Sequence, residues 1–378
     1  MVRSKRPGMR HLIKRTCFSL IPFVVILGVC ELILRLISPP WMACVRTRAC
    51  PHPERMPRLV TEQQSNFSLE KQEPLLVFHP ELFWWARPHV DGTFWSTPHV
   101  RTNEFGLREQ PFDRSPARRN ILLVGDSVAW GSLVGEEERY SNMLQRLLKE
   151  YPGYDDVQIV NAGVVGFSSF QVLQYLKTRG LERFRPRAVV FCVGINDAWS
   201  VEMSDHQQFK RYQRPIERVR RLFQTSNLFL FLERYMREFL TWARTGQNPE
   251  GLGFLYYDGK TSPQALRNTA DETEENLRKA GDLVEGHGSL PILILEDTRI
   301  EHPQSWDAEN FRQGREKERG LAQIREWSTV DIAGLTGEPW NLDRPEYLLD
   351  FCHLHPRGHR IIAELLMDVV VKTIPAHS

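Results

Sequence analysis

The chain has 378 residues, enough for one large domain or two small ones with a sizeable core. Its formal charge is +2, but residues 1–15 carry six cations and no acid, so the rest of the chain carries −4. This balance leaves no basic surface for nucleic acid, and no nucleic-acid partner is expected.

The N-terminal segment predicts a membrane anchor. A basic tail at 1–15 precedes the apolar segment 16–37, whose 22 residues are about the length that crosses a hydrocarbon core. Glu31 and Arg35 lie four residues apart near its far end, where they can pair. Cations before the segment place the N-terminus in the cytoplasm and all residues after Ser38 outside it, in the periplasm if the cell is bacterial. A cleaved signal peptide is the alternative, but no small-x-small site closely follows the apolar run.

Two segments separate this expected anchor from the main domain. Residues 38–75 are rich in proline and charge, which is typical of a stalk or linker. Cys44 and Cys50 lie in the stalk, where they form either a disulfide or an accidental pair. Residues 76–119 are rich in large aromatic side chains, which favours a segment packed on the domain over a free linker.

From residue 120 to 378, buried strands alternate with helices. Short apolar runs predict strands at 121–124, 157–161, 188–194, 291–295 and 330–332. Helical sequence lies between and after them, at 136–150, 263–284, a charged stretch ending near Trp327, and 356–371. The alternation predicts an α/β fold, a three-layer α/β/α domain with a parallel, flavodoxin-like doubly wound sheet.

The alternation breaks at 199–258, which is interpreted as a helical insertion. Two amphipathic helices are expected within it, at 215–223 and 228–240. Because the insertion leaves the sheet just after the carboxyl end of a strand, it is a candidate lid over the site. Packing of its apolar face on the domain is the alternative for these helices.

Polar residues at strand ends and a helix entry suggest nucleophilic catalysis. Ser127 follows the first expected strand, where open α/β sheets place their ligands, and is the candidate nucleophile. A serine hydroxyl needs a base, and that base needs a third group to fix its tautomer. His353, just before the last helix, is the candidate base, and Asp350 is the candidate orienting acid. His355 and His359 are the alternatives to His353.

Four motifs resemble those of the SGNH (GDSL) hydrolases. Gly125-Asp-Ser127, a glycine in the 161–166 turn, Gly194-Ile-Asn-Asp197 and Asp350-x-x-His353 have the order and spacing of that family. The resemblance covers 120–372, and residues 100–108 look like a segment of membrane-anchored members. Val128 stands where the family's name expects leucine.

The resemblance implies an oxyanion hole as well as the triad of Ser127, His353 and Asp350. Its donors would be the backbone N–H groups of Ser127 and Gly166 and the side-chain amide of Asn196. Gly163 is the alternative glycine.

Other chemistries lack their sequence requirements. The elbow of α/β-hydrolases needs Gly-x-Ser-x-Gly, and Ala129 stands at the second glycine. The sequence has neither paired Cys and His ligand spacing nor a glycine-rich phosphate loop, so no metal or cofactor is expected. Asp126 and Asp197 are expected to bond backbone groups in their turns rather than to act as the catalytic acid.

The sequence therefore predicts a serine ester hydrolase that works through an acyl-enzyme outside the cytoplasm. Its expected substrate is an O-acylated carbohydrate or a lipid-like ester. An O-acyltransferase that modifies a cell-envelope polysaccharide with the same triad is one alternative, and a catalytically silent envelope scaffold is the other.

Overall fold

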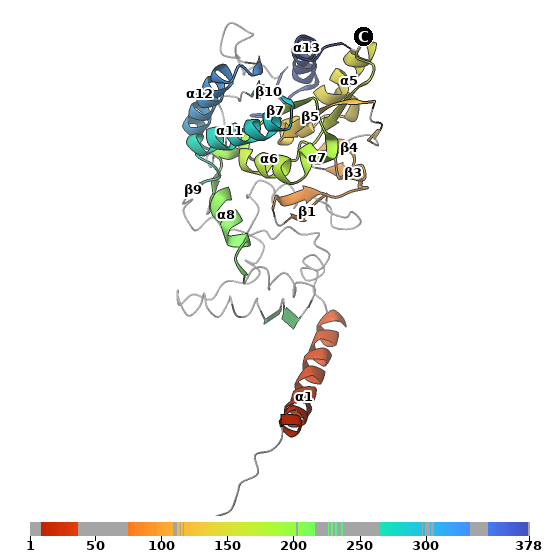
Figure 1. Ribbon diagram of the computed structural model, residues 1–378, viewed down its shortest axis with the longest axis vertical. Coiled ribbons are helices and arrows are strands. Elements are labelled where there is room, and N and C mark those ends of the chain that lie inside the picture. Colours follow the sequence, from red (N-terminus) through yellow and green to blue (C-terminus); the bar gives the residue numbers. More distant parts are fainter. Residues whose placement is uncertain are drawn as a thin grey trace, which may run out of the picture. The chain divides into compact units, whose positions relative to one another are not determined.

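The computed structural model describes residues 9–36, 75–108, 112–215, 265–332 and 347–376, with short gaps in these ranges, and a few residues between 226 and 236. The chain divides into two units. One comprises Met1–Cys50 with Gln213–Gly253, and the other comprises Pro51–Tyr212 with Phe254–Ser378. The second unit contains the strands β5 (Arg119–Gly125), β7 (Ala188–Cys192) and β10 (Leu290–Leu295), labelled in Figure 1. By its residue ranges it also contains every residue of the expected site.

The described part of the first unit is mainly one helix, α1 (Met9–Leu36). Arg35 Nε lies 2.8 Å from Glu31 Oε1, the pairing that their spacing predicts. Within the residues that the structure describes, no helix combines the length and the hydropathy of a membrane span. Cys44, Cys50 and most of the expected helices at 215–223 and 228–240 lie outside the described residues.

Five parallel strands form the central sheet of the second unit, as predicted. They are β5 (Arg119–Gly125), β6 (Val157–Asn161), β7 (Ala188–Cys192), β10 (Leu290–Leu295) and β11 (Ser328–Asp331). Their spatial order is β11-β10-β7-β5-β6, which in chain order is the 2-1-3-4-5 arrangement of the flavodoxin type. All five carboxyl ends therefore lie at one edge of the sheet.

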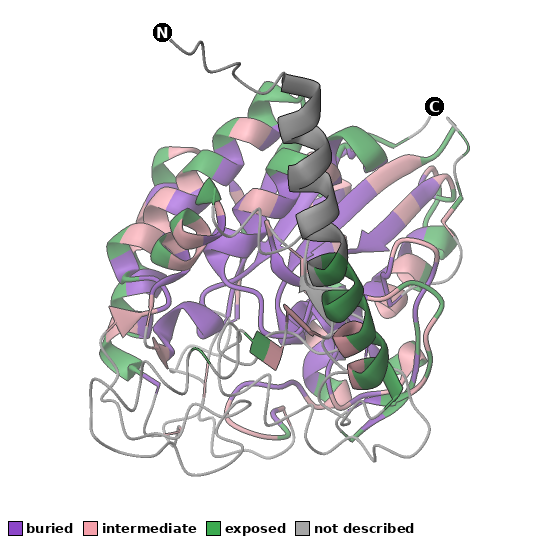
Figure 2. Cartoon of the chain, turned by 90° about the horizontal axis from the view of Figure 1, so that it is seen from below, coloured by how far each residue is buried: buried purple, intermediate pink, exposed green. Residues whose placement is uncertain are grey.

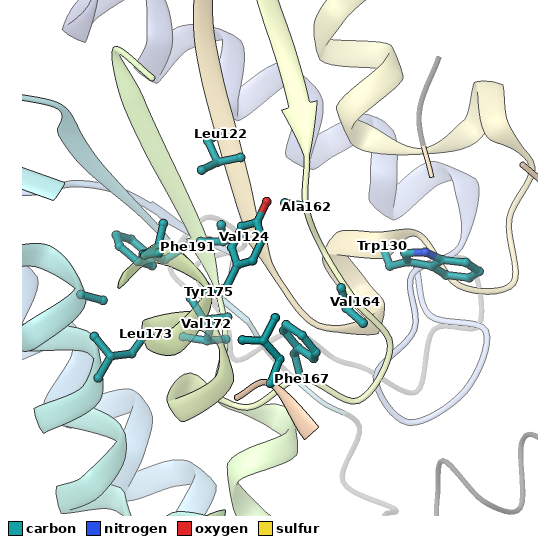
Figure 3. Close-up of a cluster of buried hydrophobic side chains, with 14 of the residues drawn as sticks. Leu122, Val124, Trp130, Ala162, Val164, Phe167, Val172, Leu173, Tyr175 and Phe191 are labelled. Atoms are coloured by element: carbon teal, nitrogen blue, oxygen red, sulfur yellow. The ribbon is translucent and has the colours of Figure 1, made fainter. Parts of the chain in front are cut away.

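Helices cover both faces of this sheet, which explains why its strands are nearly continuous apolar runs. Within β5, Leu122 and Val124 enter one core with α6 (Ser169–Tyr175) and α11 (Ala270–Gly286), as Figure 3 shows in part. Ile121 and Leu123 enter the other core, with α5 (Tyr140–Glu150) and α13 (Pro356–Thr373). The strands are buried between the two helical layers (Figure 2). The remaining helices of these layers are the π-helical turn Leu176–Gly180, α7 (Leu181–Phe184) and α12 (Ala308–Ile324).

Two expected helices begin later than predicted. The helix expected at 136–150 is split into a 3-10 turn, Glu136–Glu138, and α5, because Arg139 between them has extended backbone and buries its side chain. The helix expected at 263–284 begins only at Ala270. Thr269 and Glu272 form a reciprocal capping box there, which satisfies the free N–H groups of the first turn.

The aromatic segment forms two small antiparallel hairpins within the second unit. One pairs β1 (Leu76–His79) with β2 (Phe83–Ala86), and the other pairs β3 (Asp91–Phe94) with β4 (Thr97–Arg101). Trp85 stacks on Tyr175 with ring centroids 4.9 Å apart, and Phe94 meets Trp130 edge to face at 5.6 Å. These rings are part of the domain's core rather than of a linker.

The insertion starts and ends at the same place. β8 (Ser200–Val201) pairs antiparallel with β9 (Ala265–Leu266), so its two ends are joined by backbone hydrogen bonds. Helix α8 (Asp205–Tyr212) follows β8, where no helix was predicted. Two short elements lie at strand ends: α4 (Ser127–Trp130) after β5 and the 3-10 turn Ile195–Ala198 after β7.

Candidate active site

Ser127, His353 and Asp350 form one hydrogen-bonded chain at the carboxyl edge of the sheet. His353 Nε2 lies 2.9 Å from Ser127 Oγ, and His353 Nδ1 lies 2.6 Å from Asp350 Oδ2. Ser127 and His353 are 226 residues apart in sequence, and both side chains are buried. This geometry can pass a proton from the hydroxyl to the ring, with the carboxylate holding the ring in place.

Local sequence explains where the serine lies. β5 ends at Gly125, and a Cβ at this glycine would overlap the carbonyl of Cys192 on the neighbouring strand. Asp126 then caps helix α4 by accepting the N–H of Val128 at 2.8 Å. Ser127 is therefore the first residue of α4, with its own backbone N–H among those that a helix start leaves unpaired.

The loop before α13 holds the acid and the base together. Asp350 Oδ1 accepts the backbone N–H groups of Cys352 at 2.9 Å and His353 at 2.7 Å. Burial acts to raise the pKa of Asp350, but the hydrogen bonds and charge of His353 outweigh it and lower that pKa to about 2. The carboxylate is thus ionised at every pH at which the imidazole can act as a base.

The two alternative histidines have other roles. His355 caps α13, with Nδ1 accepting the N–H of Arg357 at 3.3 Å. His359 is buried on α13, accepts the N–H of Tyr140 and stacks on that ring. Burial, followed by the charges of Arg139 and other nearby cations, lowers the pKa of His359 to about 3. Neither contacts Ser127 among the described residues.

Asn196 reaches the site from the third strand end. Its side-chain amide donates to Asp126 Oδ2 at 3.0 Å, which fixes the plane of the amide and leaves its second N–H for another acceptor. Gly194, two residues before it, has φ +118°, and the guanidinium of Arg315 occupies the space that a side chain would need. The turn that presents Asn196 therefore depends on a glycine.

The two candidate glycines differ in whether their N–H is already bonded. Gly163 donates to Asn161 Oδ1 at 2.9 Å, and a Cβ there would clash with the backbone of Trp130. Gly166 has φ +78°, and its N–H forms no hydrogen bond within the described part of the chain. The structure therefore favours Gly166 over Gly163 as an oxyanion donor.

The two other aspartates behave differently from each other. Asp126 accepts a backbone N–H of its own turn, as expected. Asp197 instead accepts the N–H and the hydroxyl of Ser169, at 3.0 and 2.6 Å, and so connects the turn after β7 to the start of α6. Burial raises the pKa of Asp197 to about 6. The carboxylate that lies against His353 Nδ1 is that of Asp350.

Sequence reasoning missed a buried polar cluster behind the serine. Glu296 directly follows β10, and its Oε1 accepts the thiol of Cys192 at 2.9 Å. Burial raises the pKa of Glu296 to about 7, against the opposing charge of Arg315. The sequence feature that could have indicated this cluster is the position of Glu296 directly after the apolar run 291–295, because Asp126 likewise follows a buried strand.

One group of described residues brings three possible metal ligands together. Ligand atoms of Asp350, Cys352 and His353 lie within 4.8 Å of one another. Asp350 and His353 already bond each other, at 2.6 Å, as members of the candidate triad.

Comparison with known proteins agrees with the motifs. The GDSL-like Lipase/Acylhydrolase family profile matches residues 123–361. Similar solved structures include the lipase/acylhydrolase from Enterococcus faecalis, with 16% identity, TM-score 0.44, and 69% of this chain and 99% of that one covered. An acetyl xylan esterase, AlAXEase, has 17% identity and TM-score 0.42, with 67% and 100% covered.

A third similar structure, TesA, has 14% identity and TM-score 0.40, with 67% and 99% covered. The sequence has no match among the curated proteins compared. The family profile covers more than half of the chain and includes all the motifs from Ser127 to His353. The chain therefore belongs to the GDSL-like lipase/acylhydrolase family and is a serine ester hydrolase.

Proposed function

We propose that this hydrolase cleaves esters through an acyl-enzyme formed on Ser127. The supporting observation is the continuous chain of contacts from Ser127 Oγ through His353 to Asp350, at 2.9 and 2.6 Å. In the first step Oγ attacks the ester carbonyl as its proton moves to His353 Nε2. The Asp350 carboxylate stabilises the imidazolium that forms, and His353 then protonates the leaving alkoxide. A water molecule, deprotonated by His353, releases the acid and restores the serine.

The negative charge of the tetrahedral intermediate needs donors that are in place before reaction. We assign them to the Ser127 N–H at the start of α4, the Gly166 N–H and the second amide N–H of Asn196. They follow three different strands, β5, β6 and β7, which are neighbours in the sheet. Support comes from the free Gly166 N–H and from the bond that orients the Asn196 amide.

We further propose that the domain is anchored in a membrane and acts outside the cytoplasm on an O-acylated carbohydrate or a lipid-like ester. The basic residues before α1 and the apolar segment 16–37 support this topology. Seven aliphatic side chains of α1 between residues 24 and 33 are about half or more exposed, as a lipid-facing helix would have them. External protease should digest the domain in intact cells or spheroplasts while residues 1–15 stay protected. A domain that resists until the membrane is dissolved would overturn this topology.

Labelling with a fluorophosphonate probe tests the chemistry. The wild-type chain should be labelled and inhibited, whereas Ser127→Ala and His353→Ala should each lose labelling and most turnover. Because the two residues act as one unit, the double variant should be little slower than either single variant. A wild-type chain that reacts with no probe and no ester would instead be a silent scaffold. Product analysis with and without an acceptor sugar separates hydrolysis from acyl transfer.

A further inference from the structure

The turn that presents Gly166 can exist in two forms with opposite directions of one peptide. Val164 N donates to Gly125 O at 3.0 Å, and Phe167 N closes the turn on Val164 O at 3.0 Å. Gly166 is the third of these four residues and has φ +78°, which is the mark of a type II turn. Type I turns differ by a flip of the central peptide and place the third residue near φ −90°. Glycine adopts both conformations readily, so the residue itself does not decide between them.

Trp84 bonds the central peptide of this turn. Its indole N–H donates to the carbonyl of Val165 at 2.9 Å, and its side chain is completely buried. That carbonyl and the N–H of Gly166 belong to one peptide plane, and in a trans peptide they point in opposite directions. The bond to Trp84 therefore determines where the Gly166 N–H points.

Arg267 holds the following peptide. Its Nη1 donates to Gly166 O at 2.6 Å, while Nη2 lies 2.9 Å from Asp205 Oδ2. The guanidinium is buried and lies 5.4 Å from the centre of the Trp84 ring. The two peptides that flank the α-carbon of Gly166 are thus bonded by two side chains that contact each other, one from β2 and one from the residue after β9.

We propose that Trp84 is a positioning residue that selects the turn form in which the Gly166 N–H serves the oxyanion. Arg267 supports it by holding the next peptide. The inference rests on the proposed function, because it assumes that Gly166 is an oxyanion donor. It gives the aromatic segment before the catalytic domain a role in the reaction besides packing.

The neighbouring tryptophan provides a matched control. Trp85 lies on the same strand, is buried, and also donates its indole N–H to a backbone carbonyl, Phe105 O, at 2.8 Å. Its acceptor lies outside the turn at Gly166. Both Trp84→Phe and Trp85→Phe remove one indole N–H from one carbonyl, but only the first frees the peptide of Gly166.

Steady-state ester hydrolysis by the full chain then tests the inference. Trp84→Phe should lower kcat at least tenfold while KM stays within about twofold. One oxyanion donor contributes about 10² to 10³ in kcat, and a Gly166 N–H that points away from the oxyanion loses part of that factor. The midpoint of its kcat–pH profile should not move, because the triad is untouched. Trp85→Phe should keep kcat within about twofold. Equal kcat values for the two variants would overturn the inference.

A second substitution separates the hydrogen bond from packing. Incorporating β-(3-benzothienyl)alanine at position 84 keeps the shape of the two-ring system and replaces only the N–H by sulfur. This protein should fold as the wild type does and show the same selective loss of kcat, whereas wild-type kcat would overturn the inference. If Ser127→Ala hydrolyses esters as well as the wild type, the proposed function fails. If Ser127 is required but substitutions at 84 and 85 are equivalent, only the role of Trp84 fails.

Discussion

Replacing Asp350 with asparagine should leave the candidate base in the wrong tautomer. The carboxylate accepts three hydrogen bonds, two at Oδ1 from the backbone of Cys352 and His353 and one at Oδ2 from His353 Nδ1. An asparagine side chain has only one oxygen to offer. It can therefore satisfy the two backbone donors or the imidazole, but not both sets.

The hydrogen-bond free energies favour the orientation in which the amide oxygen stays on the two backbone N–H groups. Turning the amide oxygen toward Nδ1 would lose two backbone hydrogen bonds, each worth about 1 kcal/mol net, and would set the NH2 group against two donors. Keeping the oxygen on the two backbone N–H groups loses only the hydrogen bond that Nδ1–H donates. The NH2 group then donates to Nδ1, and the imidazole proton moves to Nε2, which faces Ser127 Oγ at 2.9 Å. A protonated Nε2 cannot accept the serine proton. We expect kcat to fall about 10⁴-fold, the loss that a wrong tautomer causes in a Ser-His-Asp triad.

Initial rates of p-nitrophenyl acetate hydrolysis between pH 5 and 9, with thermal unfolding alongside, measure this effect. Asp331→Asn is the control, since Asp331 pairs with Arg319 at 2.8 Å on the edge strand β11, away from the triad. It should hydrolyse the ester as the wild type does. Activity of Asp350→Asn within about tenfold of the wild type would show that the base does not depend on Asp350.

The same variant has a consequence for acid stability. Burial acts to raise the pKa of Asp350, but the hydrogen bond and charge of His353 lower it to about 2 in the folded chain. In the unfolded chain the pKa is about 4. The carboxylate therefore adds stability that is present above pH 4 and lost as the pH falls toward 2. Asp350→Asn should unfold with a weaker dependence on pH in that window, as followed by circular dichroism. An unchanged dependence would mean that the ion pair adds no stability.

Three further substitutions probe the strand ends. Asn196→Ala should lower kcat about a hundredfold or more with little change in KM, because it removes one oxyanion donor; wild-type kcat would remove Asn196 from the site. Gly194→Ala should destabilise the fold by about 1–3 kcal/mol, since φ is +118° and a methyl group would overlap Arg315; an unchanged urea midpoint would contradict this. Burial raises the pKa of Glu296 to about 7 in the folded chain, so this carboxyl ionises at a lower pH, near 4.5, in the unfolded chain. Stability should then fall by at most about 3 kcal/mol from pH 4.5 to 7, and Glu296→Gln should lack that slope; equal slopes would refute it.

The strands and the order of the motifs could be predicted from the sequence because both are local patterns. A strand buried on two faces needs a continuous apolar run, so the runs at 121–124 and 291–295 indicated β5 and β10 directly. A polar residue at the end of such a run indicated Ser127, and the resemblance to the SGNH hydrolases added Asn196. The alternation of strands with helices predicted the parallel sheet, and the sheet implies that their carboxyl ends meet.

Contacts between distant segments could not be read in this way. Arg139 breaks a helix that local propensity favours, because tertiary packing buries its side chain. The choice between the two glycines was open in the sequence. Only the folded chain shows that Asn161 accepts the N–H of Gly163, the observation on which the proposal of Gly166 rests.

The supports of the site are the clearest case. Trp84 bonds a carbonyl 81 residues away, and Arg267 bonds one 101 residues away. The aromatic pattern of 76–119 indicated packing but no partner, and Arg267 lies where the sequence predicted a helix that begins only at Ala270. A hydrogen bond depends on the position of two atoms to within a few tenths of an ångström. Apolar periodicity determines only which face of an element is buried, so the residues of the triad could be named from sequence, while the bonds that aim them came from tertiary structure alone.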